Sequence, residues 1–389
     1  MNIEPFKIAI PDADLLDLKQ RLQRLRAPTD LGNDDWRYGT NTAYLLDLAA
    51  YWRDGYDWRA REALMNGFAH HRTEIDGVPI HFMREPGKGP APMAILLCHG
   101  WPWTFWDLHK IVRPLADPAA FGGDARDAFD VIVPSLPGYG FSTPLTRTGI
   151  NSDVTADLFV KLMTEGLGHA RFAMEGGDWG ALVGAQMGHK HTSRLTGLYL
   201  HLVPRLGAAF GQAPTEDDYA PQEAHWLRRY RRFFRTESAY AELQGTKPQT
   251  LAAALNDSPL GLLAWIIEKR RAWSDSRGDI ESVFTRDELL DTVSLYWFTQ
   301  SAGSAARFYF ERRNQPWQPV HDRMPIVEAP TAVAAFEHEI IPMPRRWAER
   351  HYNLQRWTHF EHGGHFAPME QPQLLVDDIR AFFRNLRAT

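Results

Sequence analysis

The chain has 389 residues, a formal net charge of −5 and a hydrophobic share of 44%. Its length predicts one large domain with insertions, or two domains. No run approaches the ~18 apolar residues of a membrane helix, and the start lacks the basic and apolar blocks of a signal peptide. The single cysteine, Cys98, excludes an internal disulfide. We therefore expect a soluble cytoplasmic protein without a membrane anchor or a nucleic-acid partner. The sequence does not fix the oligomeric state, and a homodimer is compatible with it.

The first part of the chain predicts a helical extension over residues 1–67. The run "DADLLDLKQRLQRL" places apolar residues at helical spacing after an aspartate that could cap a helix. The following stretch, "TEIDGVPIHFMRE", predicts a hairpin, because Asp76-Gly77 is a strong turn signal between alternating apolar positions.

Short apolar runs that end in turn residues then alternate with helical stretches. The runs are "MAILLCHG", "FDVIVPSLPGYG", "RFAMEGGDWG" and "LTGLYLHL", and later "PTAVAAFEHE" and "LQRWTHFEHGG". Such alternation indicates parallel βαβ units. Residues 204–323 are instead helical in pattern and rich in aromatic residues and arginine. We predict an α/β fold whose mostly parallel twisted sheet, residues 68–203 and 324–389, is interrupted by a helical lid.

One basic run, "HWLRRYRRFFR" from His225 to Arg235, raises the question of whether the protein binds nucleic acid. Trp226, Tyr230 and Phe234 recur every four residues, which predicts an amphipathic helix packed by its aromatic stripe. Acidic residues just upstream, in "TEDDY", further weaken a nucleic-acid interpretation.

The stretch "EGGDWGA" predicts a sharp strand-to-helix turn with Asp178 at its tip. Gly176 and Gly180 lie two residues before and after it, where such a turn leaves almost no room. A plain helix-capping aspartate is the alternative. A serine that attacked a saturated carbon would form an ether, whereas an aspartate forms an ester that water can cleave. The pattern therefore favours an electrophilic carbon bearing a leaving group, as in an epoxide or an alkyl halide.

Hydrolysis of that ester needs a base, an acid that orients it and an oxyanion hole. His365, in "HGGHF", is the candidate base, because it follows the nucleophile and the acid in chain order. "AAFEHEIIP" offers Glu339, which we favour, and Glu337. His359 and His362 recur with His365 every three residues, but Gly363-Gly364 breaks any helix that could align them on a metal, and no metal is expected. The backbone amides of Trp101, in the loop His99–Pro102, and of Trp179 are the candidate oxyanion hole.

These motifs together resemble the microsomal-type epoxide hydrolases of the α/β-hydrolase superfamily over nearly the whole chain. The family's H-G-x-P is similar to His99–Pro102, and its nucleophile, acid and histidine segments to "GGDWG", "PTAVAAFEHEIIP" and "HGGHFAPMEQP". The segments "TKPQT", "LNDSPLGL" and "LYWFTQSAGSAARFY" resemble that family's lid. The resemblance implies an α/β-hydrolase fold with an N-terminal extension, a role in detoxification and no cofactor.

The resemblance also implies two lid tyrosines, by position Tyr240 and Tyr309, that protonate the epoxide oxygen. Such an acid is needed because an alkoxide is a poor leaving group. The product would be a vicinal diol. The many aromatic residues of the lid suggest a small apolar epoxide as substrate, although most of them are expected in the core. We expect Trp103, Tyr296 and Trp297 to contact the substrate.

Two alternatives remain open from the sequence. A haloalkane dehalogenase uses the same aspartyl ester and also places a tryptophan after the nucleophile, so Trp179 does not discriminate. That group usually carries an asparagine where this chain has Trp101, and it does not need the paired tyrosines. A catalytically inactive binding member of the fold would have lost a triad residue, and none is missing from the motifs.

Overall fold

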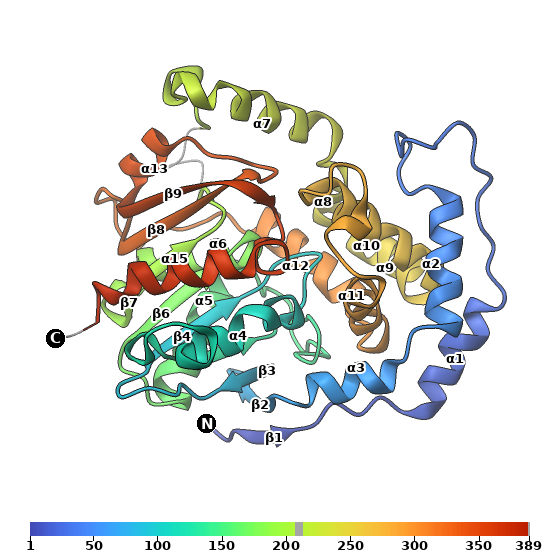
Figure 1. Cartoon of the computed structure of the whole chain (residues 1–389), viewed down its shortest axis with the longest axis horizontal. Coiled ribbons are helices and arrows are strands. Elements are labelled where there is room, and N and C mark those ends of the chain that lie inside the picture. The colour runs from blue at the N-terminus through green and yellow to red at the C-terminus, as the bar shows by residue number, and fades with distance from the viewer. Residues whose placement is uncertain (207–212, 388–389) are drawn as a thin grey trace.

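The computed structural model describes residues 1–206 and 213–387. Nine strands in these ranges form one sheet, in the order β1-β2-β3-β5-β4-β6-β7-β8-β9 (Figure 1). The bounds of the strands are β1 Glu4–Phe6, β2 Ala69–Ile75, β3 Val78–Glu85, β4 Met93–Cys98, β5 Phe129–Pro134, β6 Phe172–Gly176, β7 Leu195–Leu200, β8 Val327–His338 and β9 Tyr352–Gly364.

The strands from β4 to β9 pair in parallel, and β1, β2 and β3 add antiparallel pairs at one edge. The central strands are buried on both faces, as β6 shows, because helices cover both sides of a parallel sheet. The hairpin prediction is confirmed: Asp76 and Gly77 have φ of 52° and 77°, which suits a tight turn between twisted strands.

Helices lie on both faces of the sheet (Figure 1). On one face α4, His109–Ala116, packs against α15, Pro372–Arg384, and on the other α5, Ser152–Lys161, packs against α6, Asp178–Lys190. The short helices α13, Arg345–His351, and α14, Ala367–Glu370, flank β9. The predicted mostly parallel sheet is therefore present, and helices cover both of its faces.

The segment between β7 and β8 is helical where it is described, as predicted. Its helices are α7 Ala224–Thr236, α8 Ala239–Thr246, α9 Pro248–Asp257, α10 Pro259–Trp273, α11 Arg286–Phe298 and α12 Ala302–Asn314. Within the described ranges, no single helix is long and apolar enough to cross a membrane. The pair α9 and α10 meets the length and composition test only when taken together, across a bend of 114°.

The N-terminal extension contains α1, Asp12–Leu22, α2, Thr42–Asp54, and α3, Trp58–Met65, which lie along the lid (Figure 1). The expectation of helices alone is wrong at Glu4–Phe6, because these residues pair with β2 as an edge strand. Three residues give too little alternation to be recognised in a sequence. The indole of Trp52 donates to Ser294 Oγ at 2.9 Å, and Arg61 pairs with buried Asp291 at 2.5 Å. The extension thus contacts the lid through α2 and α3 and the sheet through β1.

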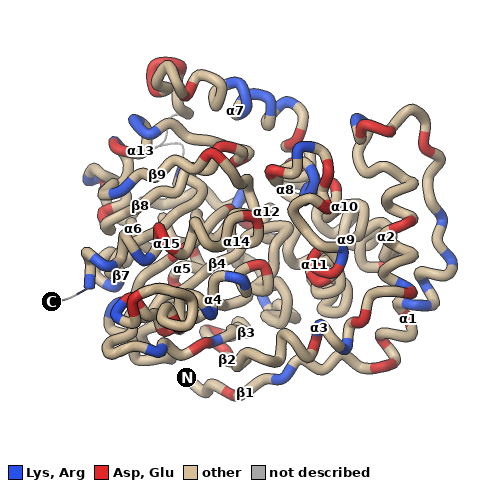
Figure 2. Tube along the Cα trace, in the orientation of Figure 1, with Lys and Arg blue, Asp and Glu red and all other residues tan. Residues whose placement is uncertain are grey.

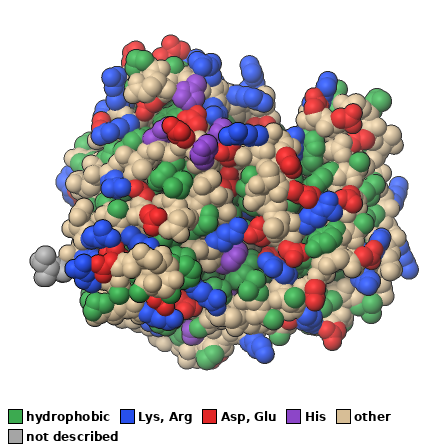
Figure 3. Space-filling model, in the orientation of Figure 1, with side chains coloured by type: hydrophobic (Ala, Val, Ile, Leu, Met, Phe, Trp, Pro, Cys, Tyr) green, Lys and Arg blue, Asp and Glu red, His purple; other side chains and the backbone are tan. Residues whose placement is uncertain are grey.

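The surface carries both signs of charge. Figure 3 shows acidic and basic side chains interspersed over one face of the molecule, and Figure 2 shows α7 as a basic stretch beside the sheet. On α7 the indole of Trp226 is buried, but Phe234 is 48% exposed. The prediction that the whole aromatic stripe packs inward is therefore wrong at Phe234, because this end of the helix faces a cavity described below.

Candidate active site

Asp178 lies where β6 turns sharply into α6. Its φ of 48° is in the left-handed region, which a non-glycine residue adopts only when its surroundings hold it there. Gly180 allows this turn, because a Cβ at that position would overlap the carbonyl oxygen of Cys98 on the neighbouring strand. The turn raises the Asp178 carboxylate above the carboxyl ends of the strands, where ligands bind in open parallel sheets.

Two groups contact the Asp178 carboxylate directly. The backbone amide of Trp101 donates to its Oδ1 at 2.7 Å, and Nε2 of His365 lies 3.5 Å from its Oδ2. Trp179 is in the first turn of α6, where backbone amides have no partner within the helix and the helix dipole favours an anion. The loop that carries Trp101 and the turn that carries Asp178 are therefore brought together.

His365 is fully buried and held from several sides. Its Nδ1 lies 3.0 Å from Oε1 and 3.1 Å from Oε2 of Glu339, and its backbone amide donates to the Trp273 carbonyl at 2.9 Å. Burial alone would lower the pKa of the imidazole, but Glu339 and Asp178 outweigh it and raise the pKa to about 10. Glu339, His365 and Asp178 thus form one chain of contacts.

Glu337, the alternative acid, faces away from His365. Its carboxylate accepts from His225 at 2.7 Å and from the indole of Trp226 at 3.0 Å, and it lies 3.1 Å from Nε2 of His359. These contacts tie α7 to β8 and β9. Within the described residues, no group of three histidine, cysteine, aspartate or glutamate side chains is placed to hold a metal ion.

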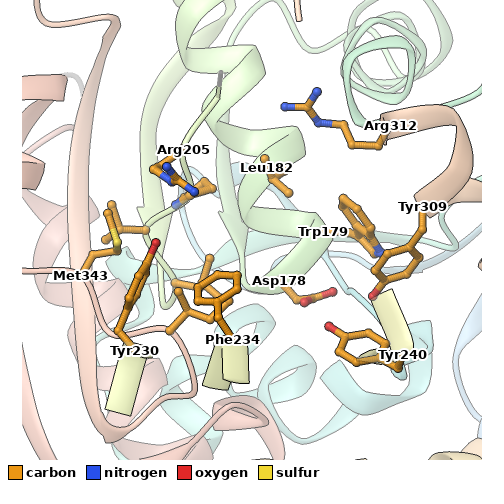
Figure 4. A pocket seen from close by; sticks show the side chains of 14 residues that line it. Asp178, Trp179, Leu182, Arg205, Tyr230, Phe234, Tyr240, Tyr309, Arg312 and Met343 are labelled. Atoms are coloured by element: carbon orange, nitrogen blue, oxygen red, sulfur yellow. The ribbon is translucent and has the colours of Figure 1, made fainter. Parts of the chain in front are cut away.

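Tyr240, on α8, and Tyr309, on α12, enter the site from the lid. Figure 4 shows both hydroxyl groups directed toward the Asp178 carboxylate. The Tyr240 ring stacks on Trp101 with centroids 4.8 Å apart, and the Tyr309 ring meets Trp179 edge-on at 4.6 Å. Burial, together with the charge of Asp178, raises the pKa of both phenols above the usual range. Both hydroxyls therefore keep their protons and can donate hydrogen bonds.

The carboxylate and the two tyrosines open onto a cavity of about 400 Å³. Its wall is mostly apolar and includes Tyr230 and Phe234 from α7. This second role of the aromatic stripe could not be predicted from the sequence, because the same spacing is typical of a helix whose aromatic residues only pack. The described residues that line the cavity are Asp178, Trp179, Leu182, Leu202, Val203, Pro204, Arg205, Tyr230, Phe234, Tyr240, Tyr309, Arg312, Ile341 and Met343.

The three residues that the sequence predicted to contact the substrate, Trp103, Tyr296 and Trp297, do not lie on this wall. Trp103 is fully buried and packs edge-on against His365, with ring centroids 5.6 Å apart. Tyr296 donates its hydroxyl proton to the Trp103 carbonyl at 3.0 Å, and Trp297 lies under the Arg21 guanidinium. These aromatic residues pack behind the site or within the lid. The number of aromatic residues in the lid could not show which of them pack and which contact the substrate.

Glu370, at the end of α14, is a residue that the motifs did not single out. Its carboxylate accepts the backbone amides of Gly364 at 2.9 Å, Phe366 at 2.8 Å and Asp275 at 2.7 Å. Burial raises the pKa of this carboxyl to about 7, against the effect of those amides. Because Gly364 and Phe366 flank His365, Glu370 holds the loop that presents the histidine.

Two family models match the chain. Residues 3–108 match the model described as epoxide hydrolase N terminus, and residues 93–372 match the alpha/beta hydrolase fold. The chain is also 36% identical to epoxide hydrolase 1 of Sus scrofa over 409 residues, which covers 98% of this chain and 88% of that one. The chain belongs to the epoxide hydrolase family.

Solved structures agree with this assignment. The epoxide hydrolase chain superimposes on juvenile hormone epoxide hydrolase of the silkworm Bombyx mori with a TM-score of 0.89 and 29% identity, over 99% of this chain and 95% of that one. The Aspergillus niger epoxide hydrolase gives a TM-score of 0.86 and 28% identity, over 100% and 97%. The predicted α/β-hydrolase fold and the resemblance read from the motifs are confirmed.

Proposed function

We propose that this epoxide hydrolase converts apolar epoxides to vicinal diols through an ester on Asp178. In the first step an Asp178 oxygen attacks one ring carbon, and the bond from that carbon to the ring oxygen breaks. Tyr240 and Tyr309 donate hydrogen bonds to the ring oxygen and supply the proton that it needs as it leaves. A hydroxyalkyl ester of Asp178 remains.

In the second step His365 accepts a proton from water, and the resulting hydroxide attacks the carboxyl carbon of the ester. Glu339 orients the imidazole and stabilises its charged form. The Trp101 amide, with that of Trp179, stabilises the oxyanion that develops on the carboxyl oxygen. The ester bond then breaks, the diol leaves with both hydroxyl groups, and Asp178 is a carboxylate again. The proton on His365 returns through solvent to the tyrosine.

The observation that carries this proposal is the convergence of two tyrosine hydroxyls on the carboxylate that His365 also faces. Tyrosine hydroxyls in this position can donate a proton to the oxygen of an epoxide ring as the ring opens. A halide leaves without needing a proton. The haloalkane dehalogenase alternative is therefore not favoured, and the comparisons point to epoxide hydrolases. A binding protein without activity has no use for the contacts among Asp178, His365 and Glu339.

Trapping the ester tests the mechanism. A His365→Gln variant, mixed with styrene oxide, is expected to gain the mass of the whole epoxide, and peptide mapping should place the adduct on Asp178. The matched control, Asp178→Asn with His365→Gln, should gain nothing. A parallel sample with a bromoalkane separates the alternative: an adduct from that reagent alone, with bromide released, would overturn ring-opening chemistry. No adduct from either would favour a binding protein.

A further inference from the structure

Two arginines line the cavity, and the mechanism above uses neither. Arg205 follows β7, and Arg312 lies in the last turn of α12. Figure 4 shows both guanidinium groups at the side of the pocket away from Tyr240. The pocket thus has a reacting end and a cationic end.

Apart from the arginines and the reacting groups, most of the described wall is apolar. Leu182, Phe234, Ile341 and Met343 contribute to it, so an alkyl chain could lie along it. The shape and the chemistry together fit a ligand with an epoxide at one end, a hydrocarbon middle and a polar group at the other end.

The positive charge of Arg312 is only partly compensated in the protein. Its side chain is half-buried and donates to the carbonyl oxygen of Leu206 at 2.6 Å, a contact that fixes the guanidinium without neutralising it. In the part of the chain that the structure describes, no carboxylate ion-pairs with Arg312 within 4 Å, and Asp153 acts on it only from further away. Arg205 is exposed and carries a second positive charge on the wall of the same pocket.

We propose that the preferred substrates are epoxides whose apolar chain ends in a carboxylate, bound by Arg312 and Arg205. This inference rests on the proposed epoxide hydrolysis. A guanidinium presents a planar fork of N–H donors that matches a carboxylate. The arrangement also keeps the substrate's charge away from Asp178, which would repel an anion close to the reacting carbon. Acids with chains too short to reach the arginines are therefore poor substrates.

The test compares three substrates of equal chain length: a medium-chain ω-epoxy fatty acid, its methyl ester and the plain epoxyalkane. Diol formation gives kcat and KM for each. The wild-type enzyme should prefer the acid over the ester by roughly tenfold in kcat/KM, the factor expected from a charge-assisted hydrogen bond. High salt should shrink this preference, because it screens partly exposed charges.

Variants of the two arginines test whether they cause the preference for the acid over the ester. Arg312→Gln and Arg205→Gln should each reduce the acid-to-ester ratio, through a higher KM for the acid with little change in its kcat. Arg312→Lys, which keeps the charge and loses the fork, should retain part of the ratio. The matched control is Arg307→Gln, on the same helix, whose guanidinium donates to Gln249 away from the pocket. It should leave all three substrates unaffected.

Two results would overturn the inference while the proposed function stands: equal kcat/KM for acid and ester in the wild-type enzyme, or a ratio that Arg312→Gln and Arg205→Gln leave unchanged. Absence of diol from all three substrates is a different result, because it removes the proposed function and the inference with it.

Discussion

Nε2 of His365 lies 3.5 Å from Oδ2 of Asp178, and this contact makes the basicity of the histidine depend on the state of the nucleophile. In the free enzyme burial lowers the pKa of His365, but Glu339 and Asp178 together raise it to about 10. Formation of the ester removes the negative charge of Asp178 that lies beside the imidazole. The pKa of His365 should then fall below that value, so the imidazole becomes a free base in the step that needs one.

This relation predicts the pH dependence of ester hydrolysis. In single-turnover experiments, the rate at which the ester decays should rise with pH through an apparent pKa below the value of about 10 in the free enzyme. Stopped-flow tryptophan fluorescence can follow the decay, since Trp179 adjoins the reacting group. A rate that rises only near pH 10 would mean that Asp178 contributes little to the pKa of His365.

The two glutamates that the sequence could not separate should behave differently on mutation. Glu339→Gln removes the charge that orients and stabilises the His365 imidazolium, so kcat should fall by roughly 10³-fold or more while the ester accumulates. Glu337→Gln is the matched control, because it loses contacts to α7 and not to His365. Since α7 lines the pocket, this variant should change KM more than kcat. Equal losses of kcat in both variants would contradict the assignment of Glu339.

What the sequence could predict depends on how local the signal is. Gly176, Asp178 and Gly180 lie within five residues, so their spacing alone indicates the strained turn. The role of Glu370 is set by backbone amides that any residue supplies, so no side-chain pattern marks it. The position of Arg312 on the pocket wall depends on how α12 packs against α8, α9 and the Trp179 ring of α6, which is a property of tertiary structure.

The two tyrosines should act in the first step only. Tyr240→Phe or Tyr309→Phe should slow formation of the ester by roughly 10- to 100-fold, and the double variant should lose more, since the remaining acid is gone. The rate of ester hydrolysis should change little. Tyr296→Phe is the control, because its buried hydroxyl bonds to the Trp103 carbonyl and not to the pocket. An unchanged rate of ester formation in the double variant would show that solvent supplies the proton.

Glu370 should act as a positioning residue for His365. Glu370→Ala leaves three buried backbone amides without an acceptor, and each such loss costs about 1–3 kcal/mol, so the free energy of unfolding should drop clearly. Glu370→Gln keeps one side-chain oxygen as an acceptor and should fold more stably than the alanine variant. In the Glu370→Gln variant the His365 imidazole would be held less firmly, so ester hydrolysis should slow while KM stays the same.

The split between kcat and KM separates this role from simple stabilisation of the fold. Thermal unfolding of both Glu370 variants gives their stability, and single-turnover kinetics at a temperature where both are folded gives each step. If Glu370→Gln hydrolyses the ester at the wild-type rate, the carboxylate only stabilises the loop, and the backbone bond from His365 to Trp273 is enough to place the imidazole.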